Sequence, residues 1–223
     1  MKILFNDIIQ YSDAPKELKS PALSDTYETD EPIIINFDKP YPINSIGIGN
    51  YNNNELIAEF DNGIQFVIDY NKSGLYVMEK TILTSRIKLL TKKIIGNFSI
   101  GRIAAGIACN IPTSITKEPS LISTSAPRVT LSGQVISGAG GYNYKTISLD
   151  SRYKITKEIM QEIEDGYKYI GMGYPFFIDL KDESYKLLFD KLYANERNQR
   201  SMTFQSGIHK FLYSRRFEFE ERF

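Results

Sequence analysis

The sequence predicts a mainly β protein of the β-sandwich or jelly-roll class, and three observations support this prediction. Short apolar runs alternate with turn-forming residues at a spacing of roughly ten residues over the first half of the 223-residue chain. Helical periodicity is absent from the same half. Tyrosine and phenylalanine are frequent, with 15 and 13 copies, which suits strands and contact surfaces, although a genome rich in A and T produces the same bias.

Residues 1–32 are predicted to form an extended N-terminal arm or a loosely packed edge. The segment carries little apolar periodicity and is interrupted by three prolines. Its first apolar stretch is too short for a signal peptide and ends at Asn6 and Asp7. No apolar run in the chain approaches the roughly 20 residues that span a bilayer. We therefore expect a protein that is soluble or enters an assembly, with an arm that becomes ordered against a neighbour.

Residues 33–110 are predicted to form the β-sandwich domain. Proline, glycine, asparagine and aspartate separate its apolar runs, and the tripeptide Asp61-Asn62-Gly63 is a strong hairpin signal. The expected strands are 33–37, 43–48, 56–60, 64–70, 75–83, 87–95 and 98–108.

Residues 111–145 are predicted to be a loop or linker. Three prolines lie among serine, threonine and glycine, and a glycine-rich cluster occupies 138–141. We expect a long excursion with short strands, such as one over 128–135, rather than an element of the core.

Residues 146–223 are predicted to form a strand-helix-strand α+β part that packs on the sandwich or extends it. Thr156 is a suitable helix N-cap, and the helix expected over 157–169 places four apolar side chains near one face. The other expected elements are strands over 145–155, 175–180, 201–204 and 210–221 and a short helix or turn over 184–189.

The charge balance favours a subunit of an assembly. Lysine plus arginine and aspartate plus glutamate both number 27, so the formal net charge is zero. A zero balance argues against broad electrostatic affinity for nucleic acid or anionic membrane, although it is compatible with local basic patches. Low net charge also promotes association between proteins.

Reactive side chains are few. Cys109 is the only cysteine and is expected to be a buried, reduced thiol, so neither a disulfide nor a thiolate metal site is expected. His209 is the only histidine, and no carboxylate and nucleophile in the sequence are evident partners for it. The glycine cluster lacks the features of a phosphate loop. We therefore predict no catalytic residue, no metal site and no cofactor, while a hydrolase that uses Asp179 or His209 is the enzymatic alternative.

The C-terminal run over 213–223 is the most distinctive segment of the chain. On a strand, one face of this run is mostly aromatic and the other is charged. One interpretation is a sheet strand whose polar face forms cross-strand ion pairs. The other is a docking edge for a neighbouring subunit, for which the candidate interface residues are Arg215, Arg216, Phe217, Phe219 and Phe223.

Three segments resemble a family of tailed-phage virion proteins that contain a galactose-binding-like (discoidin-like) sandwich. The first is 42–50 (PINSIGIGN), where a strand ends in a Gly-Asn turn, and the second is 100–106 (IGRIAAG). The third, 140–177, corresponds to a small strand-helix-strand element. The resemblance covers 33–223, but relatives often have an aromatic-rich segment where this chain has 107–112 (IACNIP).

The resemblance implies a structural subunit of the virion, made in the host cytoplasm, that builds the tail tip, the baseplate or a collar around the tail. Its expected partners are the tail tube, the hub or neighbouring subunits of a homo-oligomeric ring, without membrane or nucleic acid. The alternative is a carbohydrate-binding module for adhesion to the host, because discoidin-like domains bind glycans and sometimes calcium through loops at one end. The candidate residues for such a loop are Asn50, Asn52, Asn53 and Asp61.

Overall fold

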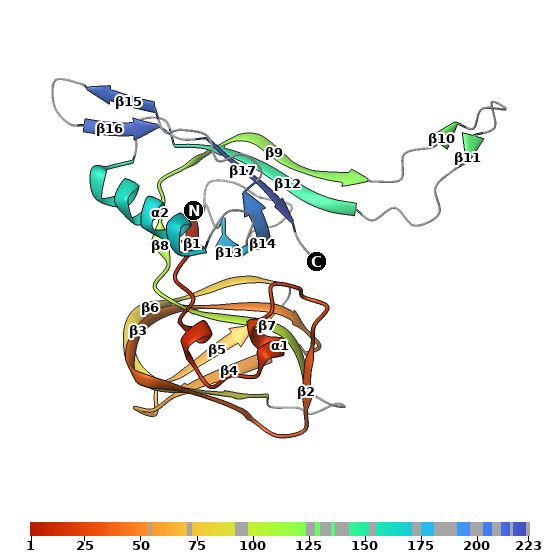
Figure 1. Cartoon of the computed structure of the whole chain (residues 1–223), viewed down its shortest axis with the longest axis vertical. Helices are drawn as coiled ribbons and strands as arrows, with labels where there is room; N and C mark the ends of the chain where they lie inside the picture. Colours follow the sequence, from red (N-terminus) through yellow and green to blue (C-terminus); the bar gives the residue numbers. More distant parts are fainter. Residues whose placement is uncertain are drawn as a thin grey trace.

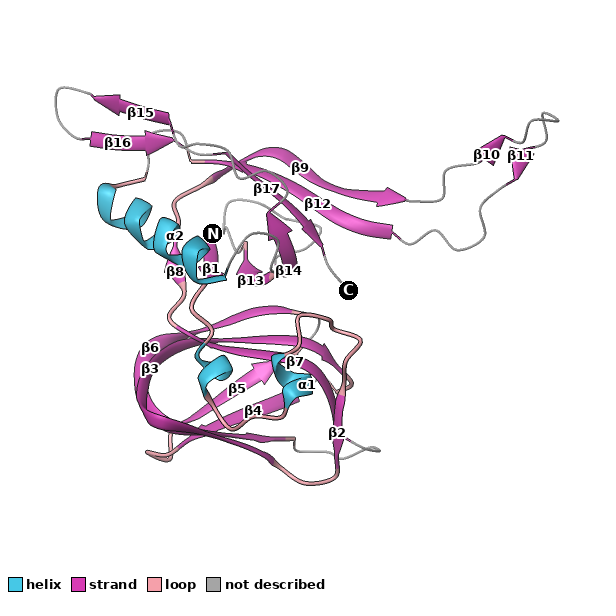
Figure 2. Cartoon of the chain, viewed as in Figure 1, coloured by secondary structure: helices cyan, strands magenta, loops and turns pink. Residues whose placement is uncertain are grey.

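The computed structural model shows a mainly β fold, which confirms the predicted class at that level (Figures 1 and 2). It describes residues 1–53, 55–70, 73–91, 98–123, 128–129, 135–136, 143–151, 155–170, 175–180, 191–196, 203–206, 211–214 and 216–221. Most of its strands belong to two sheets, a curled sheet of six strands and a C-terminal sheet of seven strands. Neither α-helix in the described residues has the length and apolar character needed to cross a membrane.

The curled sheet is antiparallel throughout and has the strand order β2-β7-β3-β6-β4-β5. Its strands are β2 (Tyr27–Thr29), β3 (Ile33–Tyr51), β4 (Glu55–Phe60), β5 (Gln65–Asp69), β6 (Gly74–Leu90) and β7 (Phe98–Gly106). Gly63 closes the β4–β5 hairpin with a positive φ of 77°, so the hairpin predicted at this turn is confirmed.

β3 and β6 are long enough to take part in both halves of the curled sheet. The end of β3 pairs with β7 and with the start of β6, whereas the start of β3 pairs with the end of β6, next to β4. The register shifts between Asn36 and Tyr41 and again between Ile43 and Ser45. Pro40 lies in the first shift, where the missing ladder donor is tolerated. The sequence predicts two short strands in each region, and the structure joins them into one bent strand.

The inner face of the curled sheet encloses the first hydrophobic core. Side chains of β3 alternate between the two faces, so Ile33, Ile35 and Phe37 are buried while Ile34 is half exposed. Apolar side chains from β4, β5, β6 and β7 also belong to the core.

The structure departs from the extended arm predicted over 1–32. η1 (Ile8–Tyr11) and α1 (Lys16–Lys19) pack on β7 and the curled sheet, and Ile8, Ile9 and Leu18 belong to its core (Figure 1). A single 3-10 turn and a one-turn α-helix are too short to produce a visible apolar period. The buried side chains of this segment therefore gave no signal in the sequence.

The C-terminal sheet has the order β8-β1-β13-β14-β17-β12-β9 and includes the first strand of the chain. Its strands are β1 (Lys2–Leu4), β8 (Cys109–Asn110), β9 (Ser114–Ser123), β12 (Asn143–Asp150), β13 (Phe176–Asp179), β14 (Lys191–Glu196) and β17 (Arg216–Glu221). β1 lies between β8 and β13 and pairs with both. The N-terminus is thus built into a sheet whose other strands all follow the curled sheet in the chain.

The loop or linker predicted over 111–145 is corrected in part. β9 pairs with β12 along its length, so 114–123 belong to the C-terminal sheet. Pro119 lies where the β9–β12 register shifts, on the outermost strand of the sheet, and a proline is tolerated there. The strand predicted over 128–135 is instead a pair of two-residue strands, β10 (Arg128–Val129) and β11 (Val135–Ile136).

The helix predicted over 157–169 is confirmed as α2 (Lys157–Ile170). Oγ1 of Thr156 accepts a hydrogen bond of 3.4 Å from the N–H three residues later, which is the geometry of an N-cap. Ile163 of α2 is fully buried in a second core, together with side chains of β1, β12, β13 and β17.

Phe5, directly after β1, connects α2 to the C-terminal sheet. Its ring centroid lies 5.2 Å from that of Tyr167 in α2 and 5.6 Å from that of Phe176 in β13. A Cβ added at Gly166 of α2 would overlap the Phe5 side chain, so the helix can approach only because a glycine occupies this position.

The remaining C-terminal predictions agree with the described strands to within a few residues. The strand expected over 145–155 ends earlier, as β12, and the strand expected over 210–221 is divided into β16 (Phe211–Ser214) and β17. β15 (Thr203–Ser206) pairs with β16 as a separate hairpin. The short helix or turn predicted over 184–189 lies outside the described residues.

A third cluster of buried side chains joins the two sheets. Leu4, Leu23, Leu75, Ala104 and Phe177 pack together, and they come from β1, β6, β7, β13 and the segment before β2. The connection after β1 and the connection from β7 to β8 both pass between the sheets. The junction is therefore a packed interface that the chain crosses twice.

Candidate functional site

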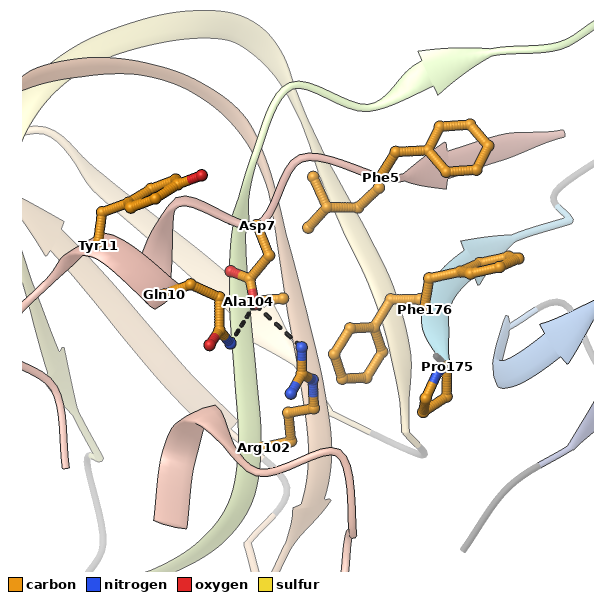
Figure 3. Close-up of a pocket in the computed structure, with 10 residues that line it drawn as sticks. Phe5, Asp7, Gln10, Tyr11, Arg102, Ala104, Pro175 and Phe176 are labelled. Carbon is orange, nitrogen blue, oxygen red and sulfur yellow. Dashed lines mark hydrogen bonds and ion pairs between the residues drawn. The ribbon is translucent and has the colours of Figure 1, made fainter. Parts of the chain in front are cut away.

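A cavity of about 290 Å³ lies at the junction of the two sheets (Figure 3). Its lining residues come from both sheets and from the N-terminal segment: Leu4, Phe5, Asp7, Gln10, Tyr11, Arg102, Ala104, Pro175, Phe176 and Phe177. The volume lies just below the range for small-molecule pockets, about 300–1,000 Å³. Most of the wall is apolar, so the cavity suits a small uncharged group.

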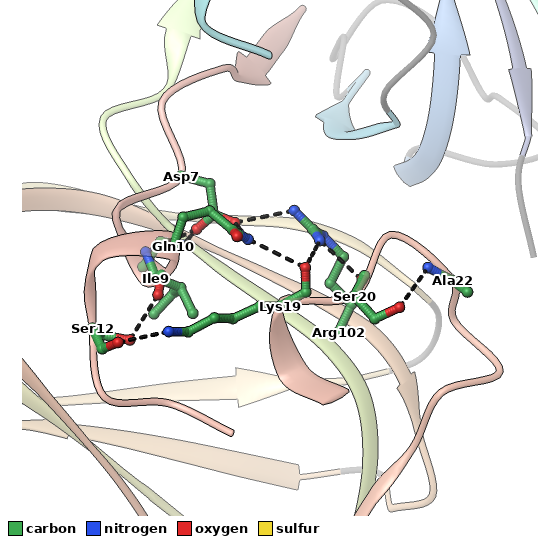
Figure 4. Close-up of polar contacts among 9 residues, drawn as sticks. Asp7, Ile9, Gln10, Ser12, Lys19, Ser20, Ala22 and Arg102 are labelled. Carbon is green, nitrogen blue, oxygen red and sulfur yellow. Dashed lines mark hydrogen bonds and ion pairs between the residues drawn. The ribbon is translucent and has the colours of Figure 1, made fainter. Parts of the chain in front are cut away.

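Asp7 lies on the polar side of the cavity and accepts hydrogen bonds from backbone and side-chain donors. Its Oδ1 accepts from the backbone N–H groups of Ile9 (3.0 Å) and Ala105 (3.2 Å). Its Oδ2 accepts from the side chains of Gln10 (3.2 Å) and Arg102 (3.1 Å) (Figure 4). Burial raises the pKa of Asp7, and the Arg102 charge and the hydrogen bonds oppose that rise.

Arg102 connects β7 to the N-terminal segment. Its Nη1 donates to the backbone carbonyls of Lys19 (2.7 Å) and Ser20 (2.9 Å), at the C-terminal end of α1. Lys19 in turn donates from Nζ to the carbonyl of Ser12 (2.6 Å). The two buried charges are therefore matched to each other and to backbone groups. This arrangement positions η1 and α1, and it leaves the cavity with a neutral wall.

The sequence prediction missed Asp7 and Arg102, although a signal for Arg102 exists. Arg102 interrupts the apolar run 100–106, and a charged residue in such a run is rarely buried without a partner. Asp7 is likewise a charged residue next to an apolar pair, Ile8 and Ile9. Nothing in the sequence pairs the two residues with each other.

The aromatic residues predicted for a subunit interface fill a core of the chain itself. Phe217 and Phe219 in β17 are 0% and 1% exposed, and their rings are stacked with centroids 5.9 Å apart. β17 lies between β14 and β12, so it is an inner strand and not an edge. The structure therefore does not support the docking-edge interpretation for these two residues. Arg216 pairs in register with Asp150, and Arg215 and Phe223 lie outside the described residues.

Three of the four residues predicted for a ligand-binding loop lie together at the end of β3 and directly after it, and each has a partner within the chain. Asn50 has a positive φ of 50° and donates from Nδ2 to a backbone carbonyl at 2.9 Å. Asn52 accepts from a backbone N–H at 3.1 Å, and Asn53 donates to a hydroxyl at 2.9 Å. Their partners are Leu23, Ser99 and Thr91, respectively. These asparagines shape the turn between β3 and β4.

Asp61, the fourth residue, lies at the other end of β4. Its Oδ2 accepts hydrogen bonds from the backbone N–H (2.7 Å) and the hydroxyl (2.8 Å) of Ser85. These bonds hold the pKa of Asp61 below its usual value. The structure therefore separates Asp61 from the three asparagines, and the four residues do not form one ligand-binding end.

Cys109 is buried as predicted, at 2% exposed, and burial raises the pKa of its thiol. A thiol in this environment is a packing group and not a nucleophile. His209 lies outside the described residues. Asp179 is buried in β13. Over the described ranges, no three histidine, cysteine, aspartate or glutamate residues gather as a metal site would require.

Comparison of this chain with known proteins finds no matching family model, no matching curated protein and no matching solved structure.

Proposed function

We propose that this chain is a structural subunit of a tailed-phage virion, which builds the tail tip, the baseplate or a collar around the tail through contacts between subunits. The resemblance of segments 42–50, 100–106 and 140–177 to such proteins supports the proposal. The first two segments lie in β3 and β7, where they help to form the curled sheet.

The observation that carries the proposal is a two-stranded ribbon that extends beyond the C-terminal sheet. Among the residues that the structure describes, β12 pairs with β17 from Thr146 onward, while 143–145 pair with β9. Figure 2 shows β9 and β12 running past the rest of this sheet. A two-stranded ribbon is only marginally stable in water, so contact with another chain would stabilise it.

The finer fold assignment, a galactose-binding-like sandwich, is part of the same proposal. It is supported by β3 and β6, which pass from one half of the curled sheet to the other. Because this single antiparallel sheet curls around one core, its two halves are comparable to the facing sheets of a sandwich.

Immunogold electron microscopy tests the proposal. Antibodies raised against the purified chain are expected to label the tails of particles from a host that carries the gene. Deletion of the gene is expected to abolish normal tails, and complementation with the intact gene is the control. Unlabelled particles whose tails are normal after deletion would contradict the proposal. Glycan binding by the isolated chain in that case would favour the adhesion module instead.

A further inference from the structure

We infer that β5 is a pairing edge, to which a second copy of this chain adds its own β5 in antiparallel orientation. The inference deepens the proposed function and rests on it, since an assembling subunit needs contacts with its own copies. β5 is a terminal strand of the curled sheet and, within the described residues, pairs with β4 alone. Val67 in β5 and Ile64 just before it are 52% and 48% exposed, so this edge carries two large aliphatic side chains that face water.

The hairpin turn determines which backbone groups of β5 face outward. The N–H of Phe60 donates to the carbonyl of Ile64 at 3.0 Å, so these residues form a hydrogen-bonded pair. Such pairs alternate with non-hydrogen-bonded pairs along an antiparallel ladder. The even-numbered residues of β5 therefore direct their N–H and C=O groups toward β4. The three odd-numbered residues, from Gln65 to Asp69, direct theirs away from it.

The outward-facing groups fit a twofold-symmetric antiparallel pair centred on Val67. In this register Val67 faces Val67 of the second copy, and Gln65 of each copy faces Asp69 of the other. Each facing pair exchanges two backbone hydrogen bonds. The Gln65 amide donates to Glu59 of its own copy at 2.9 Å, and its second N–H can donate to the Asp69 carboxylate of the other. No like charges are opposed. The edge is thus complementary to itself, which identifies a second copy as the partner.

On the face of the sheet that points away from the core, apolar side chains of neighbouring strands form a row that ends at β5. Ile57 in β4 is paired with Val67 on one side and with Leu90 in β6 on the other. Pairing at Val67 continues this row into the second copy and covers the exposed valine. On the inner face, Phe66 lies opposite Ile68 of the second copy, which extends the first core.

The other terminal strands of the two large sheets carry features that hinder pairing. β9 contains Pro119, β2 has three residues and β8 has two. β5 has five residues with neither proline nor lysine, and only Asp69 is charged. An isologous contact at this edge joins two copies, so a ring would require a second interface between the pairs.

Substitution of Val67 tests the inference. Val67→Pro removes an N–H that β4 does not use, so the β4–β5 ladder remains while the pair loses its central hydrogen bonds. Val67→Lys places two ammonium groups opposite each other without altering the backbone. Val67→Thr keeps the β-branched shape and the N–H, and it is the matched control.

Analytical ultracentrifugation of the full chain is the readout, with circular dichroism to confirm folding. Wild type and the threonine variant are expected to sediment as dimers, and the dimer dissociation constant of the lysine variant is expected to rise at least about tenfold. The amides of residues 65, 67 and 69 are expected to exchange slowly in the dimer and faster on dilution. A wild-type monomer, or a dimer that all three variants retain, would overturn the inference.

Immunogold labelling of tails distinguishes this inference from the proposed function. Labelled tails together with a monomeric wild-type chain would overturn the β5 contact and leave the proposed function standing. A β5-dependent dimer together with unlabelled particles would overturn the proposed function and leave the contact standing.

Discussion

The Asp7 carboxylate and the Arg102 guanidinium face each other at 3.1 Å, with side chains that are only 10% and 4% exposed. Removing two charges from water costs several kcal/mol per ion, and their attraction offsets that cost only with good geometry and further hydrogen bonds. The backbone N–H groups at Asp7 and the carbonyls at Arg102 supply those bonds. We therefore expect the pair to fix the position of η1 and α1 on β7 more than it adds to net stability.

Replacement of Arg102 by methionine is expected to lower the free energy of unfolding by about 3–5 kcal/mol near neutral pH. The variant leaves the Asp7 charge buried without its counter-ion, so the pKa of Asp7 rises further above its unfolded value. A carboxyl group whose pKa is raised in the folded state contributes to folding stability at low pH. That contribution is lost as the pH rises through the folded-state pKa. The loss caused by Arg102→Met is therefore expected to shrink as the pH falls from about 8 to about 5.

Urea unfolding of the wild type and of Arg102→Met over this pH range measures the effect. The matched control is the double variant Asp7→Asn/Arg102→Met, which has no titrating group at the site. The difference in unfolding free energy between this double variant and Asp7→Asn alone is expected to be independent of pH. If the difference in unfolding free energy between wild type and Arg102→Met were the same at every pH, the pH dependence would not come from titration of Asp7, and the prediction would be wrong.

Among the elements, those defined by a few neighbouring residues were predicted best. α2 follows from an N-cap and an apolar stripe, and the β4–β5 hairpin follows from Asp61-Asn62-Gly63. β3 and β6 were divided into two because polar residues and Pro40 look like strand ends, whereas the sheet bends at that point and the strands continue. β1 and β8 have three and two residues, and only pairing with distant strands defines them.

The candidate site was less predictable than the fold, for a related reason. The alternation of 213–223 correctly indicates one aromatic face on a strand, but it does not indicate what covers that face. Phe217 and Phe219 are covered by the chain itself. Asp7 and Arg102 are separated by 95 residues, and no local pattern specifies a contact across that distance.

Replacement of Gly63 by alanine is expected to destabilise the β4–β5 hairpin by about 1–2 kcal/mol. Gly63 has a φ of 77°, in the left-handed region, and no atom beyond its own chain neighbours lies within 4 Å of an added Cβ. The loss therefore comes from the backbone conformation and not from a clash. Gly63→Asn is the control and is expected to lose less, because asparagine tolerates this conformation. Equal denaturation midpoints for wild type and the alanine variant would contradict this account of the turn.

At the scale of the whole molecule, the N-terminal segment links two cores that otherwise involve separate parts of the chain. Residues from Ile8 onward contribute to the first core, whereas Ile3 and Phe5 contribute to the second. Leu4 belongs to the cluster at the junction. The same few residues therefore complete one sheet, fill the junction and lead into the segment held by Arg102. This arrangement predicts that the two sheets unfold together in the intact chain.

Removal of residues 1–4 is expected to separate the unfolding of the two sheets. The truncation takes β1 from between β8 and β13 and removes Ile3 and Leu4, which are 0% and 2% exposed. Burial of each of these side chains contributes about 1.5–3 kcal/mol to folding stability. The first core, by contrast, contains no residue before Ile8. Hydrogen exchange is therefore expected to accelerate in β13 and β17 and to stay unchanged in β4 and β5. Ile3→Ala is the matched point variant, expected to act in the same direction with a smaller effect. Equal acceleration in both sheets would mean that the two cores still unfold as one unit without β1, which would contradict the linking role of the N-terminal segment.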